Sequence, residues 1–317
     1  MKVEDIRRIG IIGGGTMGSG LAQEFATAGY DVALQDIDDG QLIAAMARIR
    51  QNLDLMAAHD LVNGSGLDTI MGRITCLASP TEAVASADMV IEAATEKVDI
   101  KQEIFRALAK DAPAHAILAS STSAIHPDVL AEATDCPERI IVTHFGFPNY
   151  LLPLVEVARA EATSDETTAT ICALLKGIGK KVVVMKIPLP GFIVNRLQMA
   201  LMREALNIVS QGAVDPEDID TAVQNSFGRR YAVAGPLAVF DLTSLTTLIN
   251  VANQTVPHLE TSDKPFDYVK ERIEAGKLGP TTGEGIYEWT PEKEDGLRQQ
   301  LTEGLITVEK WRRGRGI

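Results

Sequence analysis

The chain has 317 residues, of which 45% are hydrophobic and 23% are charged, and its net charge is −13. This length exceeds what one hydrophobic core usually supports, so we expect about two folded domains. The negative charge disfavours nucleic acid and anionic membranes as partners, because binding either needs a concentrated basic surface. The short basic segment that begins at Trp311 is expected to be a solvated tail.

The sequence shows no pattern typical of export, membrane insertion or metal binding. The first apolar run is too short for a secretory signal, and no stretch approaches the roughly 20 apolar residues of a membrane span. Cys76, Cys136 and Cys172 lack C-x-x-C spacing, which indicates neither a disulfide framework nor a zinc site. We therefore expect a cytoplasmic protein without a bound metal.

Apolar runs alternate with amphipathic stretches through the first part of the chain. Strands are predicted at residues 8–12, 31–36, 74–78, 88–94, 116–120, 139–145, 153–159 and 180–187. This alternation is typical of an α/β fold, a doubly wound sheet of parallel β-α-β units with helices on both faces. The longer segment from Asp39 to Arg73, interrupted at NGSG, predicts a helical hairpin that projects from the sheet.

A glycine-rich loop, GGGTMGSG, follows the first predicted strand and opens a predicted helix. The motif G-x-G-x-x-G alone is weak, but this context is the one in which it binds a dinucleotide in a Rossmann fold. Gly13 makes the tight turn, Gly15 lets the backbone approach the pyrophosphate, and Gly18 allows close helix packing. Thr16 and Met17, in the first helical turn, are predicted to lie beside the cofactor phosphates.

Asp36 ends the second predicted strand, where a carboxylate can accept hydrogen bonds from the ribose hydroxyls. The same charge would repel a 2′-phosphate, so NAD is predicted rather than NADP. The alternative is a surface aspartate that caps the next helix, a role that Asp38 or Asp39 could also fill.

Strand signals end near IPLPG at residues 187–191, a linker of the kind that separates domains. Beyond it the sequence has helical periodicity with almost no alternation. We therefore predict a Rossmann domain at residues 1–188 and an all-helical domain at residues 189–317.

The segments VIEAATEKVDIKQEIF, ILASSTSAI, THF, PLVEV and PGFIVNR follow one another in the order found in the 3-hydroxyacyl-CoA dehydrogenase superfamily, which the chain resembles over nearly its whole length. The resemblance implies a homodimer, formed through a helical domain that also binds substrate, and an active site between the two domains. The family's catalytic pair is a histidine followed twelve residues later by a glutamate, and His144 and Glu156 have this spacing.

The pair also makes chemical sense by itself. Oxidation of an alcohol needs a base for the hydroxyl proton, and imidazole, with an ordinary pKa of about 6.5, suits neutral pH. A carboxylate on the far nitrogen fixes the tautomer and stabilises the cation. The alternative is an ordinary strand-end histidine beside a solvated glutamate, but His144 lies at the carboxyl end of a strand, where α/β sheets bind ligands.

The resemblance implies further site residues. Ser123 matches a serine that contacts the substrate oxygen, and Asn195 matches an asparagine that reaches the site from the helical domain. Glu96 and Lys101 match positions near the cofactor. Taken alone, Ser123 could be a helix cap, Asn195 an early-helix polar residue, and Glu96 with Lys101 an exposed charge pair.

Some positions depart from the family pattern. Phe147 replaces an expected asparagine, for which Asn149 could substitute, and Ser121 replaces another. The hairpin stretch LMAAHDLVNGSG lacks the lysines that lie near the nucleotide of CoA in acyl-CoA enzymes. YLLPLVEV resembles relatives that act on carnitine or gulonate, and the predicted loop FGRRYAVAGPL contains Arg230, whose guanidinium suits a carboxylate, although a solvated loop would look the same.

We therefore expect an NAD-dependent oxidoreductase acting at the 3-hydroxyl carbon of a 3-hydroxyacyl substrate, with a free 3-hydroxy acid favoured over a 3-hydroxyacyl-CoA. The alternative from another class is a catalytically inactive, NAD-bound structural or sensor protein.

Overall fold

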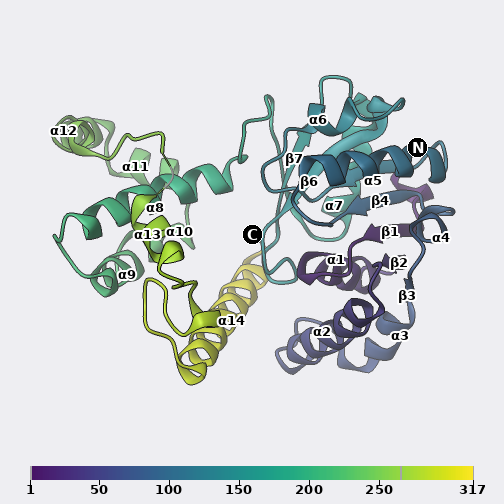
Figure 1. Cartoon of the computed structure of the whole chain (residues 1–317), viewed down its shortest axis with the longest axis horizontal. Coiled ribbons are helices and arrows are strands. Elements are labelled where there is room, and N and C mark those ends of the chain that lie inside the picture. The colour runs from purple at the N-terminus through teal and green to yellow at the C-terminus, as the bar shows by residue number, and fades with distance from the viewer. Residues whose placement is uncertain (1, 265, 317) are drawn as a thin grey trace. The chain divides into compact units, whose positions relative to one another are not determined.

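The computed structural model describes residues 2–264 and 266–316. Contacts between Cα atoms divide the chain into two compact units, Met1–Asn195 (unit 1) and Arg196–Ile317 (unit 2). In Figure 1, unit 1 runs from purple to teal and unit 2 from green to yellow. The domain boundary predicted after residue 188 stays a prediction.

Within the described part of unit 1, one eight-stranded sheet has the order β3-β2-β1-β4-β5-β6-β7-β8. This order confirms the doubly wound arrangement, because the chain moves outward from β1 in both directions. The strands are β1 (Arg8–Ile12), β2 (Asp31–Gln35), β3 (Ile74–Leu77), β4 (Met89–Glu92), β5 (Ile117–Ser120), β6 (Ile140–Phe145), β7 (Leu154–Arg159) and β8 (Lys181–Val184).

The sheet is parallel except at one edge. β7 pairs with β6 in antiparallel register, and β8 pairs with β7 in parallel register. Only residues 146–153 join β6 to β7, and this connection is too short for the crossover that a parallel pair needs. The reversal places His144 directly opposite Glu156.

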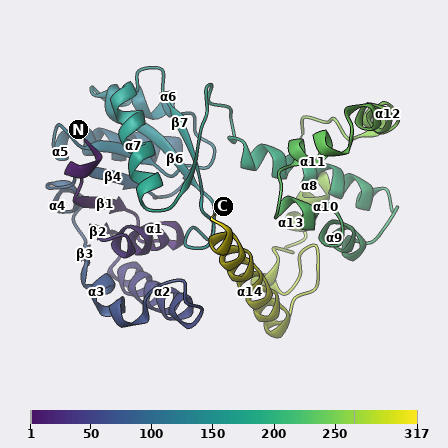
Figure 2. The ribbon, with the colours of Figure 1, turned by 180° about the vertical axis from the view of Figure 1, so that it is seen from behind.

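Helices cover both faces of the sheet, as predicted (Figure 2). Ile9 and Ile11 of β1 pack on one side with residues of four helices, and Val90 of β4 packs on the other with residues of three. The first face carries α1 (Thr16–Thr27), α2 (Asp39–Ala58), α3 (Leu67–Gly72) and α7 (Asp165–Gly177), and the second carries α4 (Pro80–Val84), α5 (Val98–Asp111) and α6 (Pro127–Ala131).

The predicted hairpin is present as α2 and α3, and α2 packs on α1. Leu42, Ile49 and Leu53 of α2 are buried in the same cluster as Leu21 and Phe25 of α1. The apolar side chains of α2 are therefore covered by α1.

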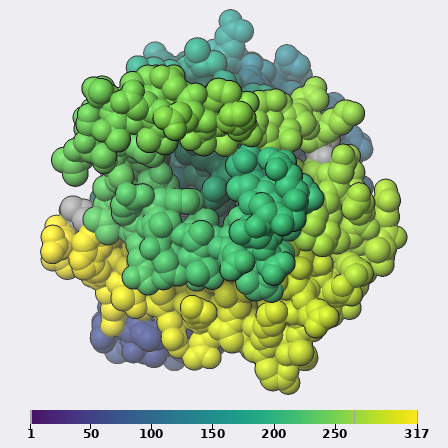
Figure 3. Space-filling view, turned by 90° about the vertical axis from the view of Figure 1, so that its left-hand side faces the viewer, coloured from purple at the N-terminus to yellow at the C-terminus, as the bar shows by residue number. Residues whose placement is uncertain are grey.

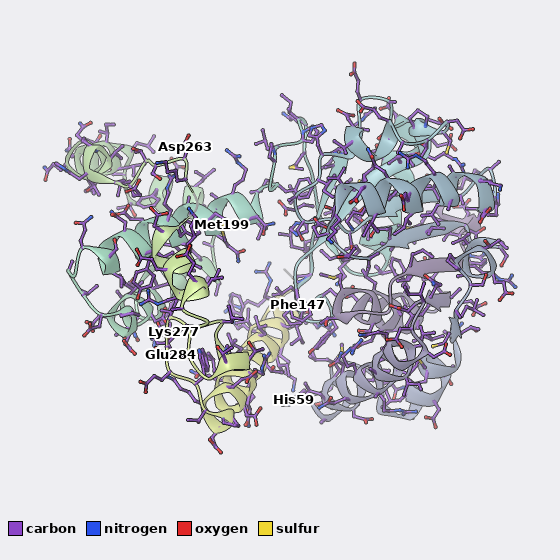
Figure 4. All side chains as sticks on the ribbon, in the orientation of Figure 1. His59, Phe147, Met199, Asp263, Lys277 and Glu284 are labelled. Atoms are coloured by element: carbon purple, nitrogen blue, oxygen red, sulfur yellow. The ribbon has the colours of Figure 1, made fainter. Side chains whose placement is uncertain are left out.

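Unit 2 is all-helical in the residues that the structure describes, as predicted; Figure 3 shows one face of it in space-filling form. Its helices are α8 (Val194–Ser210, which begins in unit 1), α9 (Pro216–Gln224), α10 (Phe227–Tyr231), α11 (Pro236–Thr243), α12 (Leu245–Thr255), α13 (Asp267–Glu274) and α14 (Pro291–Arg315). An ion pair of 2.5 Å between Lys277 and Glu284 closes the turn after α13 (Figure 4).

The basic C-terminal segment is not a loose tail, because it forms the last turns of α14. Arg313 there pairs with Glu309, one turn earlier. No helix in the described residues is both long and apolar enough to span a bilayer.

Candidate active site

The glycine loop connects β1 to α1. Gly13 has φ of 107°, and a Cβ added there would lie 2.7 Å from a backbone carbonyl oxygen. A Cβ added to Gly18 would lie 1.8 Å from the Gly13 oxygen, so both positions require glycine. At Gly15 an added Cβ would meet no atom within 4 Å, which leaves open space at the start of α1. The first N–H groups of the helix, including those of Thr16 and Met17, fit a phosphate there.

Asp36 follows β2 and lies beside this loop. Its Oδ2 accepts a hydrogen bond of 2.7 Å from the Gly14 N–H, and its Oδ1 accepts one of 3.0 Å from the Asp38 N–H. The N-cap of α2 is Asp38, whose side chain accepts from the Gly40 N–H. The capping alternative therefore applies to Asp38, and the Asp36 carboxylate stands next to the loop, where an adenosine ribose would fit.

His144 and Glu156 form a buried dyad. The Nδ1 atom of His144 lies 2.7 Å from Oε2 of Glu156, and the side chains are 10% and 1% exposed. Oε1 of Glu156 accepts hydrogen bonds from the N–H groups of Ile193 (2.7 Å) and Val194 (3.1 Å). Because a carboxylate can only accept, Nδ1 carries the proton, and Nε2 is left as the basic nitrogen.

Phe192 belongs to this site, although the sequence analysis gave it no role and placed it just after the predicted linker. Its side chain is 1% exposed, and its ring centroid lies 5.4 Å from that of the His144 imidazole. Its φ of 53° lies in the left-handed region that bulky residues rarely adopt, directly after Gly191 with φ of 76°. The apolar residue after a glycine in PGF was the signal that could have indicated it.

Ser123 and Asn195 are in direct contact. The Nδ2 group of Asn195 donates a hydrogen bond of 2.9 Å to the backbone oxygen of Ser123. Ser123 follows β5, which is the parallel neighbour of β6. The carboxyl ends of these strands meet at one edge of the sheet, so Ser123 and His144 are brought to the same edge.

Glu96 and Lys101 also interact, and of the exposed pair that the sequence left open only Glu96 is exposed, at 44% of its side chain. Lys101 is 1% exposed, and its Nζ lies 3.2 Å from Oε2 of Glu96 and 2.6 Å from Oε1 of Glu92. Burial alone would raise the pKa of Glu96, but hydrogen bonds from Thr122 and Ser123 and the charge of Lys101 lower it overall. Contact of Glu96 or Lys101 with the cofactor stays a prediction, and sequence reasoning missed Glu92.

The loop between β6 and β7 departs from the family pattern in a specific way. Phe147 is 57% exposed (Figure 4), whereas Asn149 is 1% exposed. The Asn149 side chain packs on α1, where a Cβ added to Gly20 would lie 2.0 Å from Oδ1. The suggestion that Asn149 replaces the missing asparagine is therefore wrong, because its amide is buried against a helix.

The predicted arginine loop is a helix. Arg229 and Arg230 lie in α10, and Arg229 hydrogen-bonds the Gln224 oxygen and Oδ1 of Asn225, each at 3.1 Å. Arg230 is exposed. The two arginines thus differ, because Arg229 is bound to the end of α9.

Comparisons with known families agree with this geometry. The family model described as 3-hydroxyacyl-CoA dehydrogenase, NAD binding domain, matches residues 8–187, and the one described as its C-terminal domain matches residues 191–289. The chain belongs to the 3-hydroxyacyl-CoA dehydrogenase family. It is thus an NAD-dependent oxidoreductase, and the glycine loop fits that cofactor.

Two curated relatives within the family have different substrates in their names. The chain is 34% identical to 5-formyl-3-hydroxy-2-methylpyridine 4-carboxylate 5-dehydrogenase of Mesorhizobium japonicum, over 98% of this chain and 99% of the relative. It is 37% identical to L-carnitine dehydrogenase of Streptomyces griseus, over 75% of this chain and 70% of that protein.

Solved structures of similar proteins also differ in the substrate that their descriptions name. A crystal structure of the 5-formyl-3-hydroxy-2-methylpyridine 4-carboxylic acid 5-dehydrogenase, described as an NAD+-dependent dismutase, has a TM-score of 0.91, 33% identity and coverage of 98% and 99%. That of (S)-3-hydroxybutyryl-CoA dehydrogenase from Ralstonia eutropha has a TM-score of 0.74, 33% identity and coverage of 90% and 99%.

Proposed function

We propose that this dehydrogenase acts on a small 3-hydroxy acid with a free carboxylate, in the direction of oxidation or its reverse. The observation that carries the proposal is the charge of the last turn of α2 and its connection to α3. Residues 55–66 include no lysine or arginine, and Asp54 and Asp60 are exposed. The phosphates of CoA need cationic or donor-rich surface. The nearest arginines of α2 are engaged elsewhere: Arg50 with Asp68, and Arg48 with the Gly14 oxygen.

The dyad supplies the proton chemistry. When bound, NAD supplies the hydride acceptor. Nε2 of His144 accepts the hydroxyl proton as the carbon–oxygen double bond forms, and the resulting imidazolium is stabilised by Glu156. The two backbone N–H groups on Oε1 fix the Glu156 carboxylate and hold its other oxygen toward Nδ1.

Ser123 and Asn195 hold the reacting oxygen. The hydroxyl of Ser123 and the amide of Asn195 are both donors, and the hydrogen bond from the Asn195 amide to the Ser123 backbone oxygen links the two residues. Oriented donors of this kind fix the hydroxyl oxygen, so that its proton faces the imidazole. They also stabilise the partial negative charge that the oxygen carries during the reaction.

Arg230 binds the substrate carboxylate in this proposal, since its guanidinium is exposed and planar. Arg230→Met should raise KM for the acid by about tenfold to a hundredfold, as expected from losing a charged hydrogen bond of roughly 1.5 to 3 kcal/mol, with a smaller effect on kcat. Arg229→Met is the matched control, because that guanidinium already binds α9. Equal KM values in the wild type and Arg230→Met would remove the role.

A second candidate is oxidation of an aldehyde on a carboxylated ring. It is favoured by the near-complete match to the pyridine carboxylate dehydrogenase, whose substrate carries both a formyl group and a carboxylate. A hydrated aldehyde presents the same H–C–OH unit as a secondary alcohol. The dyad could therefore accept its proton in the same way, and the product would be a carboxylic acid.

The deciding measurement is kcat/KM for NADH formation with a panel of substrates. The panel contains carnitine, a sugar acid such as gulonate, a formylated pyridine carboxylate and 3-hydroxybutyryl-CoA. We expect a free acid from the first three to be preferred. A tenfold or greater preference for the thioester would contradict the proposal and would favour an acyl-CoA substrate.

We also propose that the protein is a homodimer through unit 2. Many large apolar side chains of this unit are exposed, among them Met199 (49%, Figure 4), Leu237 (86%) and Leu242 (90%). Exposed apolar surface of this extent is typical of interfaces. Light scattering after gel filtration should give twice the chain mass of 34.1 kDa. A monomer at micromolar concentration would contradict the dimer.

A further inference from the structure

A buried charged network joins the carboxyl ends of β4 and β5, and the proton chemistry above does not use it. Glu92, the last residue of β4, is fully buried. Its Oε1 accepts hydrogen bonds from Nζ of Lys101 (2.6 Å) and from the Ala94 N–H (2.7 Å), and its Oε2 accepts one from the Ser120 hydroxyl (2.6 Å). Both oxygens of the carboxylate thus accept hydrogen bonds, and all three donors lie in segments that border the site.

Two routes lead from Glu92 to Ser123. In the first, Lys101 contacts Oε2 of Glu96, whose Oε1 accepts hydrogen bonds from the Thr122 hydroxyl and from the Ser123 N–H (2.9 Å). In the second, Oγ of Ser120, which donates to Glu92, accepts a hydrogen bond of 3.1 Å from the N–H of Thr122, the residue before Ser123. The turn that carries Ser123 is therefore held from both sides.

Stability alone does not account for such a network. Burying two charges costs desolvation, and apolar residues of the same volume often serve stability equally well. A buried polar network is instead able to fix one conformation, because each partner has a defined hydrogen-bond direction. The fixed element here is the turn from Ser120 to Ser123.

We propose that Glu92 is a positioning residue for Ser123, acting through Lys101 and Glu96 on one side and through Ser120 on the other. The inference rests on the proposed function, in which Ser123 holds the reacting oxygen. Lys101, which is 1% exposed, connects Glu92 to Glu96 in this network.

The substitution Glu92→Gln tests the network with little change of volume. Glutamine keeps one accepting oxygen and replaces the other with an NH2 donor, so either the Ser120 hydroxyl, or both Lys101 Nζ and the Ala94 N–H, lose their acceptor. Lys101 would then have Glu96 as its remaining carboxylate partner. Ser120→Ala is the second variant, because it removes the other route without placing a charge in the interior.

Glu24→Gln is the matched control. Glu24 is also largely buried, at 11% side-chain exposure, and pairs with a lysine, Lys180, but it lies on α1 and away from this network. Hydrogen exchange read out by mass spectrometry should show faster exchange in residues 121–125 of Glu92→Gln and Ser120→Ala, by about fivefold or more, as the loss of one hydrogen bond implies. Exchange there should not change in Glu24→Gln.

Kinetics give the second readout. Both test variants should lower kcat by about tenfold to a hundredfold, the effect of a small misplacement at a reacting centre, while the Kd for NADH stays within about twofold. A merely structural role would lower the yield and the melting temperature, but it would not lower kcat while the Kd for NADH stays unchanged.

The possible outcomes separate the two proposals. Unchanged exchange in residues 121–125 of both variants, or faster exchange with unchanged kcat, overturns the role of Glu92. A large rise in the Kd for NADH in Lys101→Met, without faster exchange, shows direct contact with the cofactor and also overturns it. Faster exchange in an enzyme that turns over no panel substrate supports the network but counts against the proposed function.

Discussion

Glutamine in place of Glu156 gives the sharpest test of the dyad. The two N–H groups of Ile193 and Val194 converge on Oε1, so the single carbonyl oxygen of glutamine must face them. The amide NH2 then occupies the place of Oε2, 2.7 Å from Nδ1 of His144. Two N–H donors would meet there unless the imidazole adopts its other tautomer, in which Nε2 carries the proton. The nitrogen that should act as base would then be blocked.

The size of the effect follows from these contacts. The lost charge-assisted hydrogen bond is worth about 1.5 to 3 kcal/mol, which alone corresponds to roughly tenfold to a hundredfold in rate. The wrong tautomer also removes the base, whose usual contribution is about 10² to 10⁴-fold. Because both losses concern one proton transfer, they do not add. We expect kcat to fall by about 10² to 10⁴-fold.

The assay is kcat for NADH formation as a function of pH, together with the melting temperature. Glu156→Gln should change the pH profile as well as the rate. The double variant with His144→Ala should be no slower than His144→Ala alone, since the two residues act as a unit. A kcat within threefold of the wild type, with the same pH profile, would refute the reasoning.

Three further predictions follow from the same structure. Asp36→Ser should narrow the preference for NAD over NADP, because it removes the charge that would repel a 2′-phosphate; equal turnover of the wild type with both cofactors would show that the ribose assignment is wrong. His144→Ala should lower kcat by about 10² to 10⁴-fold and leave the Kd for NADH nearly unchanged, as fluorescence titration would show. Burial raises the pKa of Glu24 to about 7, although Lys180 lowers it. Because this folded-state pKa exceeds the usual value of 4.5, thermal stability should fall as pH rises from about 4.5 through 7, and Glu24→Gln should flatten that dependence; parallel melting curves of the two proteins would contradict it.

Much of the fold could be predicted because the signals are local. The apolar runs and the glycine loop define the strands and the first helix, and Gly18 is required by a contact with Gly13 in the same loop. The direction of a strand in the sheet cannot be predicted in this way, since parallel and antiparallel strands can have the same apolar pattern. The short connection at residues 146–153 was the available signal for the reversal of β7.

The site was predictable where spacing carries the information, as for His144 and Glu156. It was not predictable where the partner is distant in sequence. Glu92 and Ser120 look like ordinary strand ends, and their hydrogen bond joins positions that only the sheet brings together. The domain boundary, the homodimer, the cytoplasmic location and the ligand contacts of individual residues stay predictions.

The reversal of β7 makes the dyad part of the backbone ladder rather than of a loop. His144 and Glu156 are paired by register, so a slip of one residue would turn the carboxylate to the opposite face of the sheet. Residues 146–153 close the hairpin between them. Phe147, which is exposed in this segment, can therefore be exchanged while the proton-transfer pair stays intact. For enzyme design, a transfer of this strand pair to another sheet would also need the two backbone N–H groups, of Ile193 and Val194, that fix Glu156.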